Sequence, residues 1–269
     1  MRRAREWVGD LLLHSPTSLR SLRNLPIVGN LIHRLSHRVL PLDQKVWARV
    51  ERGPAEGLWL ELNPRTGQGY LRGEAERAVQ AALAERLRPG MIFYDLGANL
   101  GLFTLLAARL VTPTGKVFSF EPDPENAASL RRNIQRNGFT NVTVVESGIW
   151  STTGNMCFVA SDPASPDHGL GKFVERAPEN SGKPTPCVSL DDFIQTAPSP
   201  DAIKCDIEGA EVEALCGAGK LLQSPRRPWI ILETHSPALD QAARAMLNRF
   251  GYQLDAADKL HVLAVPLKL

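Results

Sequence analysis

The segment "FYDLGANLGLF", residues 93–103, decides how the rest of the sequence is interpreted. An apolar run ends at Asp95, and Gly97 and Gly101 follow it closely. Glycine allows tight turns and a close approach of the backbone to a ligand. We therefore expect a buried strand in "MIFYDLG", a helix in "LGLFTLLAARLV" and a ligand-binding turn between them.

Strands and helices alternate around this segment. Further strands are expected in "GKVFSFEP", "VTVVES", "AIKCDIEG", "WIILETH" and "HVLAVPL". Helices are expected at residues 74–87, in "DPENAASLRRNIQRNG", in "EVEALCGAGKLL" and in "SPALDQAARAMLNRFG". Apolar strands that alternate with helices predict an α/β fold, in which helices cover both faces of a mainly parallel sheet.

Two regions depart from this alternation. Residues 1–40 carry seven arginines, and their apolar residues at helical spacing predict two short amphipathic helices. We interpret residues 1–56 as a helical extension packed on a main domain of residues 57–269, whose first strand lies in "GLWLEL". The alternative is a basic surface that contacts an anionic membrane or a carrier protein. Residues 150–200 are rich in Pro, Ser, Gly and Asp, which predicts a substrate-side insertion with a hairpin at "TGNMCFVA" and a strand at "TPCVSL".

Composition and charge argue against several classes of protein. Of the 269 residues, 43% are hydrophobic and 22% are charged, as in ordinary globular domains. A net charge of +2 does not indicate a nucleic-acid-binding protein, and four cysteines without a CxxC pair argue against a zinc site. Asp10 interrupts the apolar run near the N-terminus, and no apolar stretch is long enough to cross a membrane. We expect a cytoplasmic protein, with membrane association through the N-terminus as the alternative.

The turn and the strand after it predict the cofactor. A dinucleotide site would require GxGxxG, whereas this turn reads Gly97-x-x-x-Gly101 and follows Asp95. A carboxylate at that position repels a pyrophosphate and suits a ligand with an ammonium or sulfonium group. Glu121 ends the next strand, about 20 residues beyond the turn, where an acid typically accepts the ribose hydroxyls. A ligand with an amine and a ribose but no phosphate is S-adenosylmethionine.

The ends of two later strands carry the candidate catalytic residues. "IKCDIEG" places Lys204, Asp206 and Glu208 on one side of a strand, and "LETH" does the same for Glu233 and His235. A hydroxyl that accepts a methyl group must lose its proton, and a neutral imidazole at His235 would act as the base near neutral pH. The structural alternatives are an ion pair of Lys204 with the two acids and a hydrogen-bonded, inert His235.

The same group of residues allows a second interpretation. Asp206, Glu233 and His235 together could hold a divalent metal ion that lowers the pKa of the acceptor. We favour the metal-free interpretation, because these side chains could equally bind hydroxyl groups of the substrate.

Several segments together resemble the FkbM family of S-adenosylmethionine-dependent methyltransferases. They are "FYDLGANLGLFT", "VFSFEPDPENAASLRRNI", "VSLDDF", "IKCDIEGAEVEALCGAGKLL" and "IILETH", which span about residues 90–236. The resemblance implies the Rossmann-like class I methyltransferase fold, with seven strands of which the last is antiparallel. It also implies a cofactor site, to which it assigns Asp95, Gly97, Ala98, Asn99, Gly101, Glu121, Pro122, Ser147 and Gly148. Glu146 departs from the small residues that are usual near the adenine.

Members of this family are taken to methylate hydroxyls of sugars and secondary metabolites. We therefore expect an O-methyltransferase that acts on a hydroxylated small molecule or glycan and no nucleic acid, with a homo-oligomer left open. The alternatives are an N-methyltransferase of a small molecule and a non-catalytic binding module tethered by its basic N-terminal helices. A dehydrogenase is disfavoured because GxGxxG is missing.

Overall fold

The computed structural model describes residues 45–63, 67–159, 172–174 and 183–267. The two amphipathic helices expected within residues 1–40 lie outside these residues, and so do residues 160–171 and 175–182 of the expected insertion.

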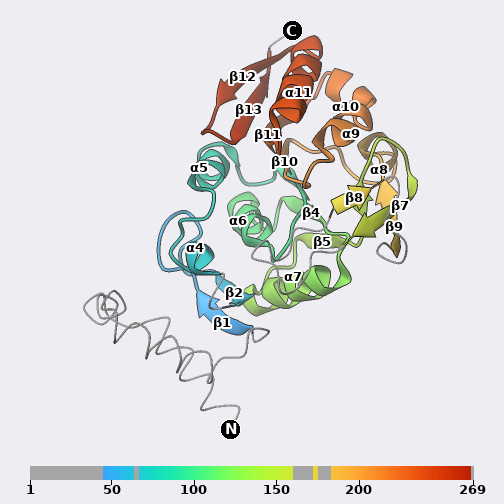
Figure 1. The fold of residues 1–269 in the computed structure, drawn as a ribbon. Helices are drawn as coiled ribbons and strands as arrows, with labels where there is room; N and C mark the ends of the chain where they lie inside the picture. The colour runs from blue at the N-terminus through green and yellow to red at the C-terminus, as the bar shows by residue number, and fades with distance from the viewer. Residues whose placement is uncertain (1–44, 64–66, 160–171, 175–182, 268–269) are drawn as a thin grey trace, which may run out of the picture.

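A seven-stranded sheet forms the centre of the molecule, with the strand order β12-β13-β11-β10-β3-β4-β5 (Figure 1). Five strands run parallel, namely β3 (Ile92–Leu96), β4 (Lys116–Phe120), β5 (Val142–Val145), β10 (Ala202–Cys205) and β11 (Trp229–Glu233). The last strand, β13 (His261–Pro266), is inserted antiparallel between β11 and β12 (Tyr252–Ala256). The expected α/β fold, with seven strands of which the last is antiparallel, is confirmed.

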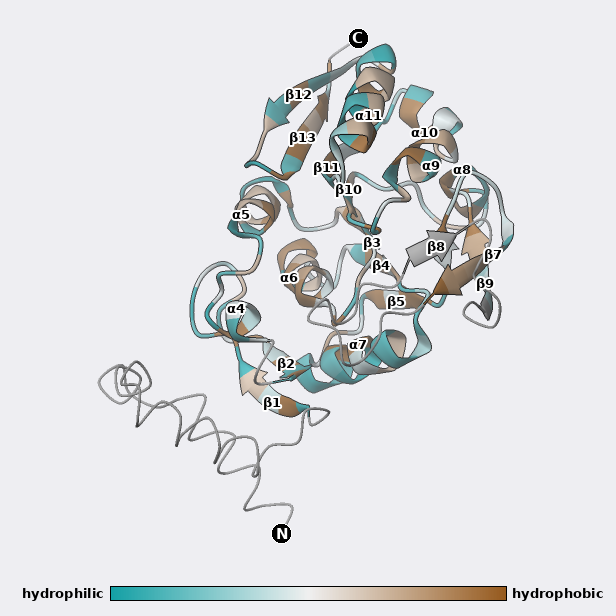
Figure 2. Ribbon diagram, in the orientation of Figure 1, coloured by the Kyte–Doolittle hydropathy of each residue, from teal (hydrophilic) through white to brown (hydrophobic). Residues whose placement is uncertain are grey.

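Each face of this sheet is covered by its own hydrophobic core, because successive side chains of a strand point to opposite faces. On one face, Phe93 and Val117 pack with α5 (Arg77–Arg86) and α6 (Leu102–Val111). On the other, Tyr94 and Ile203 pack with α9 (Glu211–Cys216), α10 (Gly219–Gln223) and α11 (Pro237–Arg249). Figure 2 shows the resulting pattern, with hydrophobic α6 against the sheet and hydrophilic outer surfaces on α5 and α7 (Pro124–Asn137).

The helix expected in "EVEALCGAGKLL" is wrong in one respect, because α9 and α10 are two helices separated by a break. A Cβ atom added at Gly217 would lie 2.3 Å from the carbonyl oxygen of Trp150, so the chain at the break packs against neighbouring backbone. The carboxylate of Asp191 then accepts hydrogen bonds from the backbone N–H groups of Lys220 (2.8 Å) and Leu221 (2.9 Å). These bonds satisfy donors at the start of α10 and favour a new helix over a continuous one.

The insertion forms a small second sheet with the order β6-β9-β7-β8. Its strands are β6 (Gly148–Ile149), β7 (Gly154–Val159), β8 (Lys172–Val174) and β9 (Lys183–Val188), and α8 (Leu190–Phe193) follows them. The segment "TGNMCFVA" pairs antiparallel with both β8 and β9, so the expected strand in "TPCVSL" is one of its partners. The first strand of this second sheet begins at Gly148, shortly after β5 ends at Val145.

At the N-terminal end of the described chain, β1 (Val46–Arg49) and β2 (Trp59–Leu62) form an antiparallel hairpin, which α4 (Gln68–Leu71) follows. The hairpin spans the boundary expected between residues 56 and 57. Its strands pair across that boundary, and β2 packs against α7. Residues 45–56 are therefore part of the main domain.

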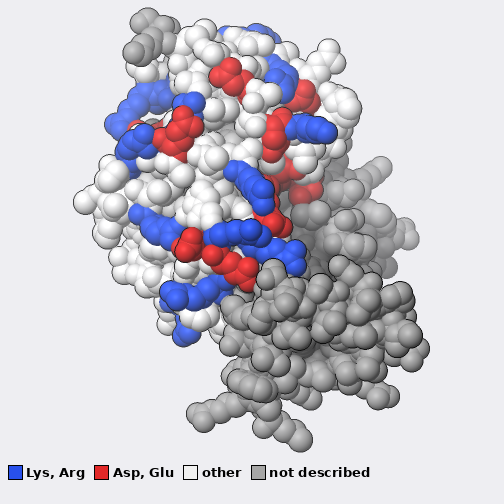
Figure 3. Space-filling model, turned by 90° about the vertical axis from the view of Figure 1, so that its left-hand side faces the viewer, with Lys and Arg blue, Asp and Glu red and all other residues white. Residues whose placement is uncertain are grey.

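The surface near this hairpin carries basic and acidic side chains next to one another (Figure 3). Arg52 and Arg77 both pair with Glu74, at 3.1 and 3.2 Å. Such exposed pairs contribute little to stability. Their interleaved charges differ from the uniform basic surface that binds nucleic acid.

Asn133 connects the hairpin, α7 and the start of α6. Its side chain is fully buried, accepts a hydrogen bond from the backbone N–H of Glu61 (2.7 Å) and donates one to the carbonyl oxygen of Leu100 (2.7 Å). A single amide thus holds β2 and the glycine turn at a fixed distance from one helix.

We predict that Asn133→Ala lowers the free energy of unfolding by about 2–4 kcal/mol, because two partly buried backbone groups lose their partner and a buried side chain is removed. Urea denaturation of the whole chain measures this change. Gln135→Ala, an exposed position on the same helix, is the control and should change stability by less than about 0.5 kcal/mol. Equal effects of the two substitutions would contradict the role of Asn133.

Candidate active site

A cavity of about 370 Å³ opens at the carboxyl ends of β3, β4, β10 and β11. In open parallel sheets this edge is the usual ligand-binding position. The lining residues are Tyr70, Glu76, Gly97–Phe103, Phe120–Pro122, Ser147–Ile149, Phe158, Lys204, Asp206–Glu208, Glu233 and His235. The volume lies within the range of about 300–1,000 Å³ that is typical of small-molecule sites.

The glycine turn fits against the end of β10. Gly97 has φ +78°, and a Cβ atom there would lie 1.9 Å from the carbonyl oxygen of Asp206. Gly101 has φ +91°, and a Cβ atom there would lie 2.2 Å from Leu130 Cδ1. Gly97 therefore requires glycine, because both its backbone conformation and the adjacent backbone exclude a side chain, whereas at Gly101 it is the positive φ that favours glycine. The close approach at Gly97 is made to the protein's own backbone and brings β10 against the cavity.

Asp95 lies behind the turn. Its side chain is fully buried, its Oδ2 accepts a hydrogen bond from Thr104 Oγ1 (2.6 Å), and its Oδ1 lies 3.9 Å from Lys204 Nζ. Burial raises the pKa of this carboxyl, and the ammonium group of Lys204 opposes that shift. The structure therefore does not bring Asp95 into the cavity, although the sequence suggested direct contact with a cationic ligand. Its acid instead faces the protein's own cation.

Glu121 lies where the sequence placed it, at the end of β4 and in the cavity wall. Its Oε2 accepts a hydrogen bond from the backbone N–H of Asn99 (2.7 Å), and its Oε1 accepts one from that of Asp123 (3.0 Å). Burial nevertheless raises the pKa of this carboxyl to about 7. These two bonds fix the carboxylate beside the glycine turn.

Lys204 is the buried cation of the site. Its ammonium donates to the carbonyl oxygen of Gly97 (3.2 Å) and to Asp206 Oδ2 (3.1 Å), and it lies over the ring of Phe103 at 5.3 Å. Burial alone would lower the pKa of Lys204, but the carboxylates of Asp206 and Asp95 outweigh it and raise the pKa. Lys204 is therefore a charged link between the glycine turn and the end of β10.

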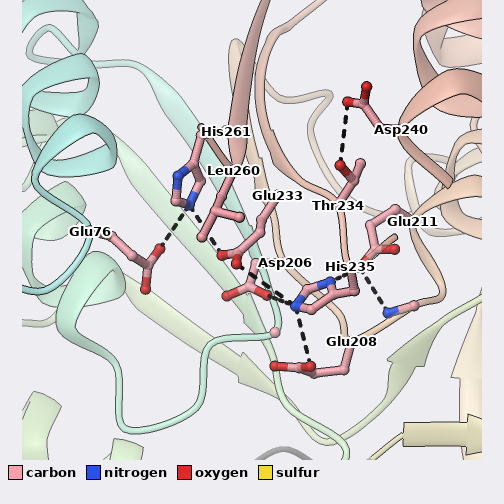
Figure 4. A network of polar contacts seen from close by, with 12 residues as sticks. Glu76, Asp206, Glu208, Glu211, Glu233, Thr234, His235, Asp240, Leu260 and His261 are labelled. Atoms are coloured by element: carbon pink, nitrogen blue, oxygen red, sulfur yellow. Dashed lines mark hydrogen bonds and ion pairs between the residues drawn. The ribbon is translucent and has the colours of Figure 1, made fainter. Parts of the chain in front are cut away.

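His235 lies among four carboxylates (Figure 4). Its Nδ1 lies 3.0 Å from Glu211 Oε1, and its Nε2 lies 3.2 Å from Glu208 Oε2 and 3.6 Å from Asp206 Oδ1. Hydrogen bonds to Glu208 and Glu211 raise the pKa of His235 to about 10. This contradicts the expectation of a neutral imidazole base, because a ring with both nitrogens bonded to carboxylates already carries both protons.

A second histidine, which the sequence did not indicate, lies on the other side of Glu233 (Figure 4). His261 Nε2 lies 3.1 Å from Glu233 Oε2 and 3.5 Å from Glu76 Oε2, and its Nδ1 lies 2.8 Å from Asp258 Oδ1. Burial would lower the pKa of His261, but its contacts with the carboxylates of Glu233, Glu76 and Asp258 outweigh it and raise the pKa to about 10. Glu233 therefore lies between two imidazoles.

Most of the residues that the sequence assigned to the site do meet in the cavity. The exceptions are Asp95, described above, and Glu146, whose side chain is about half exposed and pairs with Arg131. Sequence reasoning missed Tyr70, Glu76, Phe158, Glu211 and His261. Glu211 carried the clearest signal, since it lies three residues beyond Glu208 in the "DIEGAE" segment.

The sequence signature described as "Methyltransferase FkbM domain" matches residues 95–254, which is more than half of the chain. The chain belongs to the FkbM methyltransferase family. S-adenosylmethionine is its cofactor, as the sequence predicted.

Two relatives match this chain over part of its length. The hexuronic acid methyltransferase AglP of Haloferax volcanii is 30% identical over 169 residues, which cover 62% of this chain and 64% of that protein. The 31-O-demethyl-FK506 methyltransferase FkbM of Streptomyces tacrolimicus is 39% identical over 90 residues, which cover 34% of this chain and 30% of that protein. The chain thus spans less than two thirds of the length of each relative.

A methyltransferase FkbM from Methylobacillus flagellatus KT is similar to this chain among solved structures, with a TM-score of 0.47 and 20% identity. The match covers 74% of this chain and 54% of the other. Within the described residues, none of the helices combines the length and the apolar character that a bilayer crossing requires.

The cavity of this protein suits S-adenosylmethionine in two respects. The glycine turn brings bare backbone to the cavity, and Glu121 presents a fixed carboxylate for ribose hydroxyls. Ser147 and Gly148, which were expected near the adenine, also line the cavity. The assignment of each residue to a part of the cofactor remains a prediction.

We predict that the affinity for S-adenosylhomocysteine increases by about three- to tenfold from about pH 6 to about pH 8. The pKa of Glu121 is about 7 in the free protein, so its ionised form, which accepts hydroxyl hydrogens more strongly, predominates only at the higher pH. Isothermal titration calorimetry across this range measures the effect. Glu121→Gln should remove the pH dependence, and Glu125→Gln, at an exposed position nearby, should retain it. An unchanged pH profile in Glu121→Gln would refute the ribose assignment.

Proposed function

We propose that this protein is an S-adenosylmethionine-dependent O-methyltransferase that acts on a hydroxyl group of a small molecule, sugar or secondary metabolite. One observation carries the proposal: the polar group of Asp206, Glu208 and His235 lies in the same cavity as the glycine turn and Glu121. The acceptors named for AglP and for FkbM of Streptomyces tacrolimicus, a hexuronic acid and a demethylated FK506, support this class of substrate.

The cavity separates the tasks of binding and chemistry between two groups of residues. Glu121, Ser147 and Gly148 surround the β4–β5 end, where we place the nucleoside. Asp206, Glu208 and His235 surround the β10–β11 end, where we place the acceptor hydroxyl. The cofactor supplies a methyl group on a sulfonium, which is a good leaving group, so alignment of the acceptor can provide much of the rate.

The acceptor's proton has to move to a residue of this chain. His235 is bonded through Nδ1 to Glu211 and through Nε2 to Glu208, so neither ring nitrogen has a lone pair available in this arrangement. The carboxylate oxygens of Asp206 and Glu208 therefore accept the proton. His235 holds the two carboxylates in place and lies beside the acceptor oxygen as it develops negative charge.

Lys204 and Glu211 are positioning residues in this scheme. Lys204 bonds Asp206 Oδ2 and leaves Oδ1 directed toward His235. Glu211 is fully buried, and its Oε1 contacts both His235 Nδ1 and the backbone N–H of Gly209. Lys204 therefore fixes Asp206 from the cavity wall, and Glu211 fixes His235 from behind that wall.

We predict that Asp206→Asn, Glu208→Gln and His235→Gln each lower the turnover number by about 10²-fold or more while changing affinity for S-adenosylhomocysteine by less than about threefold. The variants lose proton transfer and acceptor alignment, but other residues, Glu121, Ser147 and Gly148, make the proposed nucleoside contacts. Steady-state kinetics and calorimetry give the two quantities. Asp240→Asn is the control, because Asp240 lies on α11 and pairs with Arg244 outside the cavity.

A panel of hydroxylated acceptors and their amine analogues tests the reaction itself. Methyl transfer to hydroxyl groups supports the proposal, whereas transfer only to amines would replace it with N-methylation. Cofactor binding without turnover on any acceptor would favour a binding module. The absence of cofactor binding would remove the proposal altogether.

A further inference from the structure

The two histidines of the site share one arrangement. The Nδ1 atom of each ring contacts one carboxylate, that of Glu211 for His235 and that of Asp258 for His261. The Nε2 atom of each ring faces two further carboxylates. These are Asp206 and Glu208 for His235, and Glu76 and Glu233 for His261. In this arrangement one carboxylate fixes the imidazole ring through Nδ1, and Nε2 faces the other carboxylates. The same arrangement is found around protein-bound metal ions.

The proposed methyl transfer uses the residues around His235 and gives no role to the residues around His261. His261 is 4% exposed, and Glu76, Glu233 and His261 come from the start of α5, the end of β11 and the start of β13. Their ligand atoms, one from each residue, lie within 4.8 Å of one another. Three distant parts of the chain thus converge on a single point.

We propose that Glu76, Glu233 and His261 form a binding site for a divalent cation at the edge of the cavity. A cation that displaces the Nε2 proton of His261 gains one imidazole nitrogen and two carboxylate oxygens, a donor set that suits Mn²⁺, Fe²⁺, Co²⁺ or Zn²⁺ better than Mg²⁺, which prefers oxygen ligands alone. Glu76 and Glu233 also line the cavity, so the remaining coordination positions can be filled by water or by a ligand there.

The unfilled bonding capacity of Glu76 supports this site independently. Its Oε2 is buried without a hydrogen-bond partner, and its nearest cation is His261 Nε2 at 3.5 Å. A buried carboxylate oxygen without a partner is costly, and a cation would satisfy it.

The charges around the cavity point in the same direction. Among the described residues that line it, five carboxylates face the cavity, from Glu76, Glu121, Asp206, Glu208 and Glu233. The lining cations are Lys204 and His235, and His261 adds a third positive charge behind Glu76 and Glu233, so the carboxylates still outnumber the cations. An additional positive charge beside Glu233 would reduce this imbalance.

The inference does not depend on the proposed methyl transfer, so its test measures binding rather than activity. The whole chain, stripped with a chelator and desalted, is titrated with Mn²⁺ alone, and free Mn²⁺ is followed by electron paramagnetic resonance. Wild type should bind Mn²⁺, and Glu76→Gln and His261→Gln should each weaken binding by at least about tenfold. Asp258→Asn should weaken it by about tenfold, because the carboxylate behind the ring is lost.

His235→Gln is the matched control, because it alters the equivalent histidine of the neighbouring group, and it should leave Mn²⁺ affinity nearly unchanged. Circular dichroism shows whether each variant is folded, and Glu76→Gln keeps the test valid if His261→Gln does not fold. Loss of binding in His235→Gln with full binding in Glu76→Gln would overturn the proposal and place the cation at Asp206, Glu208 and His235. Failure of the wild-type protein to bind either Mn²⁺ or Zn²⁺ would also overturn it.

Discussion

The buried ammonium group of Lys204 holds the site together. It lies at the junction of β10 and β3, where it contacts a carbonyl oxygen of the glycine turn and stands between the carboxylates of Asp95 and Asp206. A buried charge of this kind is tolerated only when its partners remain in place, and the loss of one partner leaves the others uncompensated. The turn, the end of β10 and the acid at the end of β3 are therefore fixed relative to one another by one side chain.

The contacts of Lys204 change the role assigned to Asp95, the acid that precedes the glycine turn. Asp95 looked like a residue that selects a cationic cofactor by contact, but its carboxylate is buried against Thr104 and Lys204. Its effect on a ligand is exerted through Lys204 and the shape of the turn. The carboxylates that do face the cavity come from the ends of β4, β10 and β11 and from the start of α5.

The sequence was sufficient for features that depend on local pattern. Apolar runs predicted the parallel strands. Glu121 directly follows one of these runs, which predicted that it lies at the end of a strand, now β4. The break between α9 and α10 was not predictable, because it depends on packing of Gly217 against Trp150, about 70 residues earlier in the chain. The convergence of Glu76, Glu233 and His261 was hidden for the same reason: the antiparallel insertion of β13 brings His261 beside the end of β11. The charge state of His235 likewise depends on Glu208 and Glu211, which approach its ring only in the folded chain.

The β1–β2 hairpin has a consequence for any shortened form of this protein. A chain that began at residue 57, the domain boundary expected from the sequence, would retain β2 but lose the strand that pairs with it. Leu60 and Leu62 are fully buried in the intact protein, and one edge of β2 would then present unpaired backbone groups beside an apolar surface. Exposed edges of this kind recruit strands from other molecules. Such a fragment would be prone to self-association, although every residue of the cavity would still be present.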